Sequence, residues 1–318
     1  MRFNKLDLNQ LVVLDALLDE CSVTKAAKRL FLSQSATSCA MARLREYFED
    51  ELLVQIGKAM VLTPRAESLR HPVREVLLQI QSITNDNPAF DPVSSDRKIV
   101  VETSDYVTSV FLGEVLRRAS IEAPRMTFRV RTAATLGVVH LENGEIDLLI
   151  TPDFRAGSTQ PVELLFEDSW SCVVCADNDR IGETLTLAEY LDAGHVIMEW
   201  AGGAIVTSDS RAAAALGYNR QAEVTVETFN VVPHFLIGTR RIATLQTRLA
   251  SLLQRYSPSL RVLPCPYPIP KLVEVVQYNK FQERDPALMW FRQLMREVAQ
   301  ASSVQVPVAL SGAGSGTA

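Results

Sequence analysis

Hydrophobic positions recur at helical spacing in two short segments between residues 22 and 48. The buried face of the first segment is formed by Ala26, Ala27 and Leu30. Thr24 is placed to cap this helix, and Phe31 and Leu32 are placed to fill the turn that follows it. We therefore expect two helices that cross closely, with the small alanines at their contact.

The second helix is expected to begin after Ser33, whose hydroxyl can act as its N-cap. Its inward face repeats at Thr37, Met41, Leu44 and Phe48. Its outward face carries Gln34, Ser35, Ser38, Ala42 and Arg45. Hydroxyl, amide and guanidinium groups bond base edges and phosphates, so the pattern indicates a helix-turn-helix that reads duplex DNA. The alternative is an ordinary helix pair with a solvated polar face.

Two short apolar runs around Gly57 and Lys58 predict a small hairpin after the second helix. This hairpin would act as a wing that sets Lys58 on the phosphate backbone, and Thr63 would cap the next helix with Pro64 at its first position. Residues 1–64 are thus expected to form a winged helix-turn-helix domain. The candidate DNA-binding residues are Thr24, Ser33, Gln34, Ser35, Ser38, Arg43, Arg45, Lys58 and Thr63.

Charge is distributed unevenly along the chain. Between residues 22 and 66 there are seven Lys or Arg residues against four Asp or Glu residues, a net charge of +3. The whole chain carries −5, so the remaining residues carry −8. A basic segment of this modest size predicts salt-sensitive contacts with DNA, with affinity that also depends on dimerisation and shape.

A long helix is expected from Thr63 to Thr84, with a kink or a short first segment at Pro72. One side of it carries Leu69, Val73, Val76, Leu77, Ile80 and Ile83. The same helix of a second copy would cover this stripe, so residues 65–92 predict a dimerisation helix followed by an Asn- and Pro-rich hinge. Two heads held in a dimer would read two half-sites. The alternative is burial of the stripe against the protein's own domain.

From residue 97 onward, strand and helix patterns alternate. The expected order is a strand at 97–102, a helix at 106–119, a strand at 126–132, a helix at 136–143 and a strand at 147–151. A second block follows at 168–267, and a strand at 272–278 returns to the first block. This rhythm is typical of a parallel sheet with helices on both faces. The fold class is thus α/β, with a two-lobed body at 93–300: lobe I at 93–167 and 268–300, and lobe II at 168–267.

A cleft between two such lobes binds small molecules at strand ends and helix starts. Ser104 directly follows the first strand of the body, and Trp200 and Phe229 are candidates for the facing wall. Arg248 could pair with a ligand carboxylate or phenolate. Each has a structural alternative: a helix cap for Ser104, core packing for the two aromatic residues and a surface ion pair for Arg248.

The sequence offers no pattern of catalytic or metal-binding residues. Cys172 and Cys175 form a CxxC, but they lie in an apolar run expected to be a strand, where residues three apart point to opposite faces. The four histidines are scattered without ligand spacing, so we expect no metal. Catalytic signatures such as G-x-S-x-G and H-E-x-x-H are absent, so we expect neither a cofactor nor enzymatic activity. A small-molecule-binding module or an enzyme remains the alternative for the body taken alone.

Length and composition favour a regulator of two or three domains that works in the cytoplasm. The 318 residues are 47% hydrophobic, but no apolar run is long enough to span a bilayer and the N-terminus lacks a signal-peptide core. Five cysteines are an odd number for a disulfide framework, which favours a reducing compartment. Residues 301–318 are small and polar, and we expect a flexible tail there.

The segment LDLNQLVVLDALLDECSVTKAAKRLFLSQSATSCAMARLREYFEDELLVQIGKAMVLTPRAE resembles the winged helix-turn-helix of the LysR-type transcriptional regulators, and the resemblance continues to about residue 300. It is nearest to the branch of nodulation regulators and activators of aromatic-compound degradation. Ser35 stands where the family often has proline, and Cys39 where it often has a basic residue. The resemblance implies a homo-oligomer, a dimer or a dimer of dimers (a homotetramer), that binds promoter DNA, with RNA polymerase as a candidate partner.

The resemblance also implies a coinducer held between two periplasmic-binding-protein-like lobes. Phe111, Asp168 and Arg248 match positions that look like pocket-lining sites in the aromatic-responsive branch. Asp168 replaces the histidine expected in salicylate-type responders, so we expect an aromatic or phenolic ligand other than salicylate. The candidate effector-binding residues are Ser104, Phe111, Thr132, Asp168, Trp200, Phe229 and Arg248. A ligand that prefers one lobe arrangement would change the placement of the DNA-binding heads.

Overall fold

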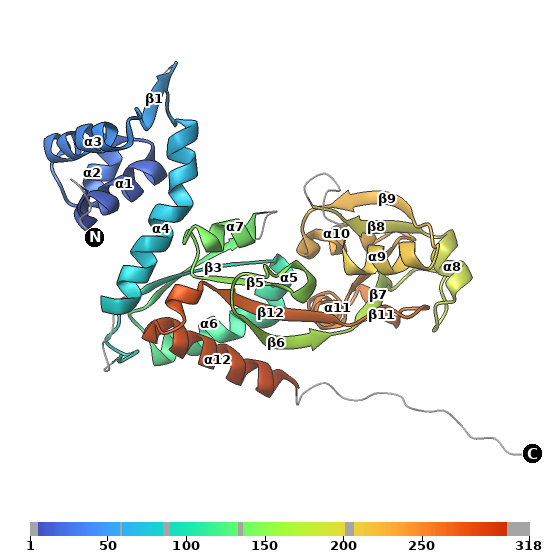
Figure 1. Cartoon of the computed structure of the whole chain (residues 1–318). Helices are drawn as coiled ribbons and strands as arrows, with labels where there is room; N and C mark the ends of the chain where they lie inside the picture. Colours follow the sequence, from blue (N-terminus) through green and yellow to red (C-terminus); the bar gives the residue numbers. More distant parts are fainter. Residues whose placement is uncertain (1–5, 58, 85–89, 133–135, 201–206, 304–318) are drawn as a thin grey trace, which may run out of the picture. The chain divides into compact units, whose positions relative to one another are not determined.

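The structure, a computed structural model, describes residues 6–57, 59–84, 90–132, 136–200 and 207–303 (Figure 1). It divides into two compact units. The head unit comprises Met1–Ala89, Val139–Ile146 and Asn279–Asp285, and the body unit comprises Phe90–Val138, Asp147–Tyr278 and Pro286–Ala318. Within the described ranges, every helix is too short or too polar to cross a bilayer.

The head unit is built on three short helices, a hairpin and a longer fourth helix. These are α1 (Leu8–Glu20), α2 (Val23–Arg29), α3 (Gln34–Phe48), β1 (Leu53–Ile56), β2 (Ala59–Leu62) and α4 (Pro64–Thr84). Leu14, Ala26 and Leu44 belong to one buried cluster that joins the first three helices. β1 and β2 pair antiparallel, and Gly57 takes the positive φ of the turn between them. The winged helix-turn-helix expected from the sequence is confirmed.

The ends of the short helices agree only in part with the expectation. Ser33 caps α3, as expected, because its hydroxyl accepts a backbone N–H at 3.1 Å. The cap of α2 is Ser22 rather than Thr24: Ser22 has the extended backbone of an N-cap, whereas Thr24 is exposed within the helix. Phe31 and Leu32 do not fill the turn, since Phe31 is 96% and Leu32 45% exposed.

The fourth helix, α4, continues through Pro72 as a single helix, so the expected short first segment is not formed. Val73 is buried in the head cluster, and Leu69 and Leu77 pack against it. Val76 remains 40% exposed. The expectation that the chain cannot cover its own apolar stripe is therefore wrong for three of these residues, because α1 packs along α4.

The first sheet of the body has the strand order β4-β3-β5-β12-β6. Its strands are β3 (Lys98–Thr103), β4 (Thr127–Thr132), β5 (Leu148–Pro152), β6 (Val162–Asp168) and β12 (Leu272–Tyr278). β3 pairs parallel with β4 and β5, but β12 pairs antiparallel with β5 and β6. The expectation of a parallel sheet is wrong where β12 pairs with β5 and β6. The reason is that β12 returns from the second lobe and runs antiparallel to both of these strands.

The second sheet has the order β11-β7-β10-β8-β9. Its strands are β7 (Trp170–Cys175), β8 (Gly194–Met198), β9 (Gln221–Val226), β10 (Ile242–Gln246) and β11 (Leu260–Pro264). It is also mixed, since β8 pairs parallel with β9 and β10 while β7 pairs antiparallel with β10 and β11. The chain crosses between the sheets at 168–170 and again at 264–272, which gives the expected two lobes.

Helices cover both sheets. They are α5 (Asp105–Val107), α6 (Gly113–Glu122), α7 (Gly137–Glu142), α8 (Leu187–Asp192), α9 (Ser208–Ala215), α10 (Pro233–Leu236), α11 (Thr247–Tyr256) and α12 (Pro286–Ser303). The helix expected at 106–119 is interrupted, because a π-helical turn at Thr108–Leu112 separates α5 from α6. Cys172 and Cys175 are both buried in β7, as the packing interpretation of the CxxC predicted. Residues 85–89 of the predicted hinge and 304–318 of the predicted tail lie outside the described residues.

Candidate DNA-reading helix and ligand cavity

The outward face of α3 is polar and accessible. The predicted DNA-binding residues Gln34, Ser35, Ser38 and Arg43 are all exposed. Their neighbour Thr37 is fully buried, and its hydroxyl donates to the Ser33 carbonyl at 3.1 Å. The hydroxyls of Ser33 and Ser35 lie 3.0 Å apart. The helix therefore offers solvent the positive end of its dipole together with hydroxyl groups, an arrangement suited to a phosphate.

Two other predicted DNA-binding residues have partners within the head. The Arg45 guanidinium donates to two backbone carbonyls that lead into β1, at 2.8 and 3.1 Å. Thr63 caps α4 through the Ala66 N–H at 3.0 Å, as expected, and donates to the Asp50 carboxylate at 2.6 Å. Both residues thus fix the wing and α4 to the head. Lys58 lies outside the described residues.

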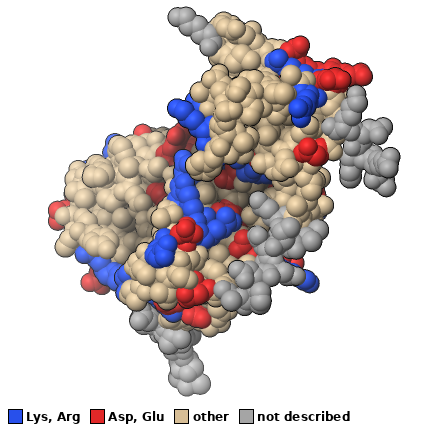
Figure 2. Space-filling view, turned by 90° about the vertical axis from the view of Figure 1, so that its left-hand side faces the viewer, with Lys and Arg blue, Asp and Glu red and all other residues tan. Residues whose placement is uncertain are grey.

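Charged side chains are mixed on the molecular surface. On the face that Figure 2 shows, Lys and Arg form small groups separated by uncharged residues and by Asp and Glu. This mixture of charges agrees with the small negative net charge of the chain.

A small cavity lies between the two sheets of the body. The first lobe contributes Ser104, Tyr106, Ile150, Thr151, Pro152, Phe154, Arg155, Leu272 and Glu274. The second lobe contributes Trp170, Trp200, Thr207, Ser208, Phe229 and Gln246. Protein cavities that bind small molecules combine aromatic walls with a few polar groups, as this one does.

Three of the predicted effector-binding residues line this cavity: Ser104, Trp200 and Phe229. The Ser104 hydroxyl also accepts the Val107 N–H at 3.2 Å, so it caps α5 at the same time. The rings of Trp200 and Phe229 meet edge to face, with centroids 5.5 Å apart. Thr132 does not line the cavity and is exposed at the end of β4.

Phe111, Asp168 and Arg248, the residues that the family resemblance singled out, form a separate cluster outside this cavity, and Asp168 and Arg248 line a different surface groove. Phe111 is buried, with its ring centroid 5.1 Å from that of Phe166, and the Arg248 guanidinium lies 4.7 Å above the same ring. Asp168 accepts the Arg248 backbone N–H at 3.2 Å and the Tyr106 hydroxyl at 2.7 Å. The cluster therefore reaches the cavity through Tyr106 rather than by lining it.

Burial controls the charge of the acids around the cavity. It raises the pKa of Asp168, although the hydrogen bond from Tyr106 acts in the opposite direction. It also raises the pKa of Glu274 to about 8, with Asp168 adding to the rise and Arg155 opposing it. The wall thus contains an acid that keeps its proton near neutral pH.

Sequence reasoning missed most of the polar cavity wall, notably Gln246 and Glu274. Leu272 and Glu274 are two residues apart on β12, so they face the same side of the sheet. A carboxylate inside the apolar run LVEVVQY is itself unusual, because acids are seldom buried without a partner. An acid inside an apolar strand was therefore the feature of the sequence that could have identified Glu274 as part of the cavity wall.

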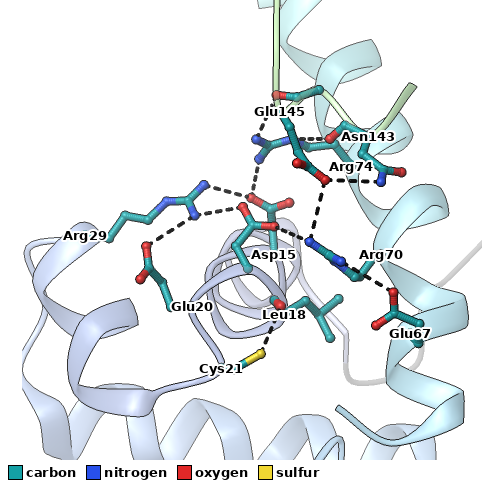
Figure 3. Close-up of polar contacts among 12 residues, drawn as sticks. Asp15, Leu18, Glu20, Cys21, Arg29, Glu67, Arg70, Arg74, Asn143 and Glu145 are labelled. Atoms are coloured by element: carbon teal, nitrogen blue, oxygen red, sulfur yellow. Dashed lines mark hydrogen bonds and ion pairs between the residues drawn. The ribbon is translucent and has the colours of Figure 1, made fainter. Parts of the chain in front are cut away.

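Arg74 on α4 joins three segments of the head unit (Figure 3). Its guanidinium donates to the Asp15 carboxylate on α1 and to the carbonyls of Asn143 at 3.1 Å and Gly144 at 3.2 Å. Gly144 has a φ of +65°, and a Cβ there would lie 2.9 Å from Arg74 Nε, so the approach requires glycine. Ion pairs around it join Arg29 to Asp19, and Arg70 to Asp19 and Glu145. We call this contact the Arg74 junction.

An exposed polar helix on a winged head, together with a cavity between two α/β lobes, defines a ligand-responsive DNA-binding regulator. Residues 8–67 match the bacterial regulatory helix-turn-helix proteins of the lysR family, and residues 94–300 match the LysR substrate binding domain. Nodulation protein D 2 of Rhizobium tropici is 42% identical over 316 residues, which span 99% of this chain and the whole of that protein. The chain belongs to the LysR family of transcriptional regulators.

Solved structures agree with this assignment. A probable transcriptional regulator from Pseudomonas aeruginosa superposes with a TM-score of 0.66 at 29% identity, covering 92% of this chain and 97% of its own. Full-length OxyR from the same species reaches a TM-score of 0.75 at 18% identity, covering 93% and 97%. The second likeness concerns the fold alone. Together they confirm a helix-turn-helix followed by a two-lobed α/β domain.

Proposed function

We propose that this LysR-type regulator binds a small aromatic or phenolic coinducer between its lobes and reads promoter DNA with α3. The observation that carries the proposal is that one chain combines an exposed polar helix on a winged head with an aromatic-walled cavity between two α/β lobes. Gln34 and Ser38 would contact base edges, while Ser35 and Arg43 would contact phosphates.

The proposed switch is a population shift between two arrangements of the lobes. Ile150, Thr151 and Pro152 of β5 line the cavity, and the turn that precedes β5 supplies the carbonyls bound by Arg74. A ligand that prefers one position of β5 would therefore act on the Arg74 junction and, through Asp15, on α1. In a dimer or a dimer of dimers, this would change the placement of paired heads on DNA and the access of RNA polymerase.

Within this proposal the protein is a regulator rather than an enzyme, and it acts in the cytoplasm, where promoter DNA is found. The other candidate is a small-molecule-binding protein or enzyme whose function does not depend on DNA. It keeps the cavity but assigns no role to the exposed polar face of α3.

Gel retardation with the DNA upstream of the protein's own gene separates these candidates. We expect saturable retardation that resists non-specific competitor, and we expect a ligand found by thermal-shift screening to change the footprint. No retardation at low salt, or turnover of an aromatic compound by the purified protein, would favour the other candidate.

A further inference from the structure

Phe31 occupies a backbone position that does not favour a bulky side chain. It follows the end of α2 with a φ of +56°. Its N–H donates to the Lys28 carbonyl at 3.3 Å, and the Leu32 N–H donates to the Ala27 carbonyl at 2.9 Å. This pair of hydrogen bonds is the Schellman motif, in which the left-handed residue is usually glycine and sometimes asparagine. The way in which α2 ends therefore gives no reason for phenylalanine at this position.

Core packing gives no reason for it either. Phe31 is 96% exposed, more than any other large hydrophobic side chain that the structure describes. The ring thus adds a strained backbone position to the head and buries no apolar surface there. A residue held in an unfavourable conformation without benefit to the fold indicates a role in function. For an exposed ring, that role is contact with a binding partner.

The surroundings of Phe31 favour DNA as this partner. Residues 22–45 contain five Lys or Arg residues and no Asp or Glu residue. Lys25, Lys28 and Arg43 are exposed in this segment. Phe31 lies two residues before Ser33, the N-cap of α3. The ring therefore adjoins the face that we propose reads DNA, in a segment whose charge attracts a polyanion.

A protein partner fits this surface less well. Specific protein interfaces bury roughly 800 Å² on each partner around a central apolar cluster. The exposed apolar surface of the turn between α2 and α3 consists of Phe31 and of Leu32, which is 45% exposed. The exposed residues on either side, Lys28, Ser33 and Gln34, are polar. A single ring among polar groups suits contact with one base better than it suits a protein interface.

We propose that Phe31 is a further sequence-reading residue, whose ring contacts the 5-methyl group of a thymine in the major groove. This inference rests on the proposed function, because α3 must enter the groove to bring the ring there. Thymine presents a methyl group in the major groove, and phenylalanine is among the apolar side chains that contact it. Phe31 thus selects thymine at one position of each half-site by apolar contact, beside the bases that Gln34 and Ser38 read by hydrogen bonding.

Replacement of thymine by deoxyuridine tests this contact, because uracil pairs as thymine does but lacks the 5-methyl group. The full chain is titrated with duplexes of the protein's own promoter in which each thymine in turn is replaced. At one position in each half-site, the replacement should weaken binding of the wild type about fourfold, as expected for the loss of one buried methyl group. In Phe31→Asn, the same replacement should have no effect.

Phe31→Asn also separates DNA binding from folding. Asparagine tolerates the left-handed conformation, so the melting temperature of the variant should equal or exceed that of the wild type. Its affinity for the unmodified promoter should nevertheless fall about tenfold, as for one mismatched base pair. A residue with a structural role alone would not give this combination.

Two further variants complete the design. Phe31→Leu keeps an apolar side chain, so it should keep part of the effect of deoxyuridine, and it replaces Phe31→Asn in the comparison if that variant does not fold. Leu216→Asn makes a similar change in the second lobe, where Leu216 is 46% exposed, and is the matched control. Its affinity for DNA and its response to deoxyuridine should be those of the wild type.

Three results would overturn the inference: no thymine whose replacement affects the wild type, the same deoxyuridine effects in Phe31→Asn as in the wild type, or unchanged promoter affinity of Phe31→Asn. If that variant bound the promoter normally but supported less transcription by RNA polymerase, the ring would contact the polymerase instead of DNA, and the inference would again be wrong.

The Gln34→Ala, Ser38→Ala double variant shows whether the proposed function fails as well. If the double variant loses specific binding while Phe31→Asn does not, α3 still reads DNA and only the role of Phe31 is wrong. If the wild type itself does not bind the promoter specifically, both the inference and the proposed function are wrong.

Discussion

The reading face of α3 and the wall of the cavity are built in opposite ways. The face of α3 belongs to one helix, and Gln34 and Ser38 are exposed on it. The cavity wall combines both sheets of the body, and its members Phe229 and Gln246 are each 3% exposed. Substitutions on the exposed face should therefore change binding alone, whereas substitutions in the wall should change folding and binding together. The exposed face of α3 separates DNA binding from stability, whereas the cavity wall does not separate ligand binding from stability.

The largest expected effect tests the body side of this comparison. Phe229 packs edge to face on Trp200 and on Tyr106, so Phe229→Ala removes both contacts and leaves a void. We expect the free energy of unfolding to fall by about 3–5 kcal/mol in chemical denaturation, together with loss of ligand binding. Tyr256→Ala is the matched control, because Tyr256 is 80% exposed. Equal stability of the two variants would show that the cavity wall is not part of the core.

The next largest effect is expected at the Arg74 junction, which would couple ligand binding to DNA binding. Arg74→Ala removes the hydrogen bonds to Asp15, Asn143 and Gly144. The variant should bind ligand and DNA separately, but the ligand should no longer change the affinity for DNA, a loss of coupling of about 1–3 kcal/mol. The coupling is measured by titrating DNA with the protein in the presence and absence of ligand and comparing the two affinities.

A second variant sharpens that result. Gly144→Ala should also weaken coupling, since the added Cβ would meet Arg74 Nε at 2.9 Å. Arg117→Ala is the control, because this exposed arginine pairs with Glu114 on its own helix, α6. Coupling that stays intact in both junction variants would exclude the Arg74 junction as the link.

The sequence was most informative where structure is local. The periodicity of α3, its Ser33 cap and the wing are properties of neighbouring residues, and these were predicted. The antiparallel entry of β12 was not, because its partners β5 and β6 lie far away in the chain. Glu274 and Gln246 line one cavity through two long-range pairings, that of β12 with β5 and β6 and that of β10 with β7 and β8. The Arg74 junction likewise joins α1 to the turn before β5, which no local pattern encodes.

The smallest expected effect is a change in the free energy of unfolding caused by substitutions within α3. Ser33→Ala removes the N-cap hydrogen bond and should lower the free energy of unfolding by about 1 kcal/mol. Ser38→Ala makes the same chemical change at an exposed position and should cost less than about 0.5 kcal/mol. Thermal or urea unfolding of the two variants compares them directly. If Ser38→Ala were the more destabilising, the reading face would be part of the fold after all.

The affinity of the Gln34→Ala, Ser38→Ala double variant for the protein's own promoter, measured at fixed salt concentration, tests the central claim most directly. Loss of base contacts predicts specific binding weaker by about 1–3 kcal/mol, with non-specific binding and the melting temperature close to those of the wild type. Unchanged specific affinity in a folded double variant would contradict the claim that α3 reads DNA.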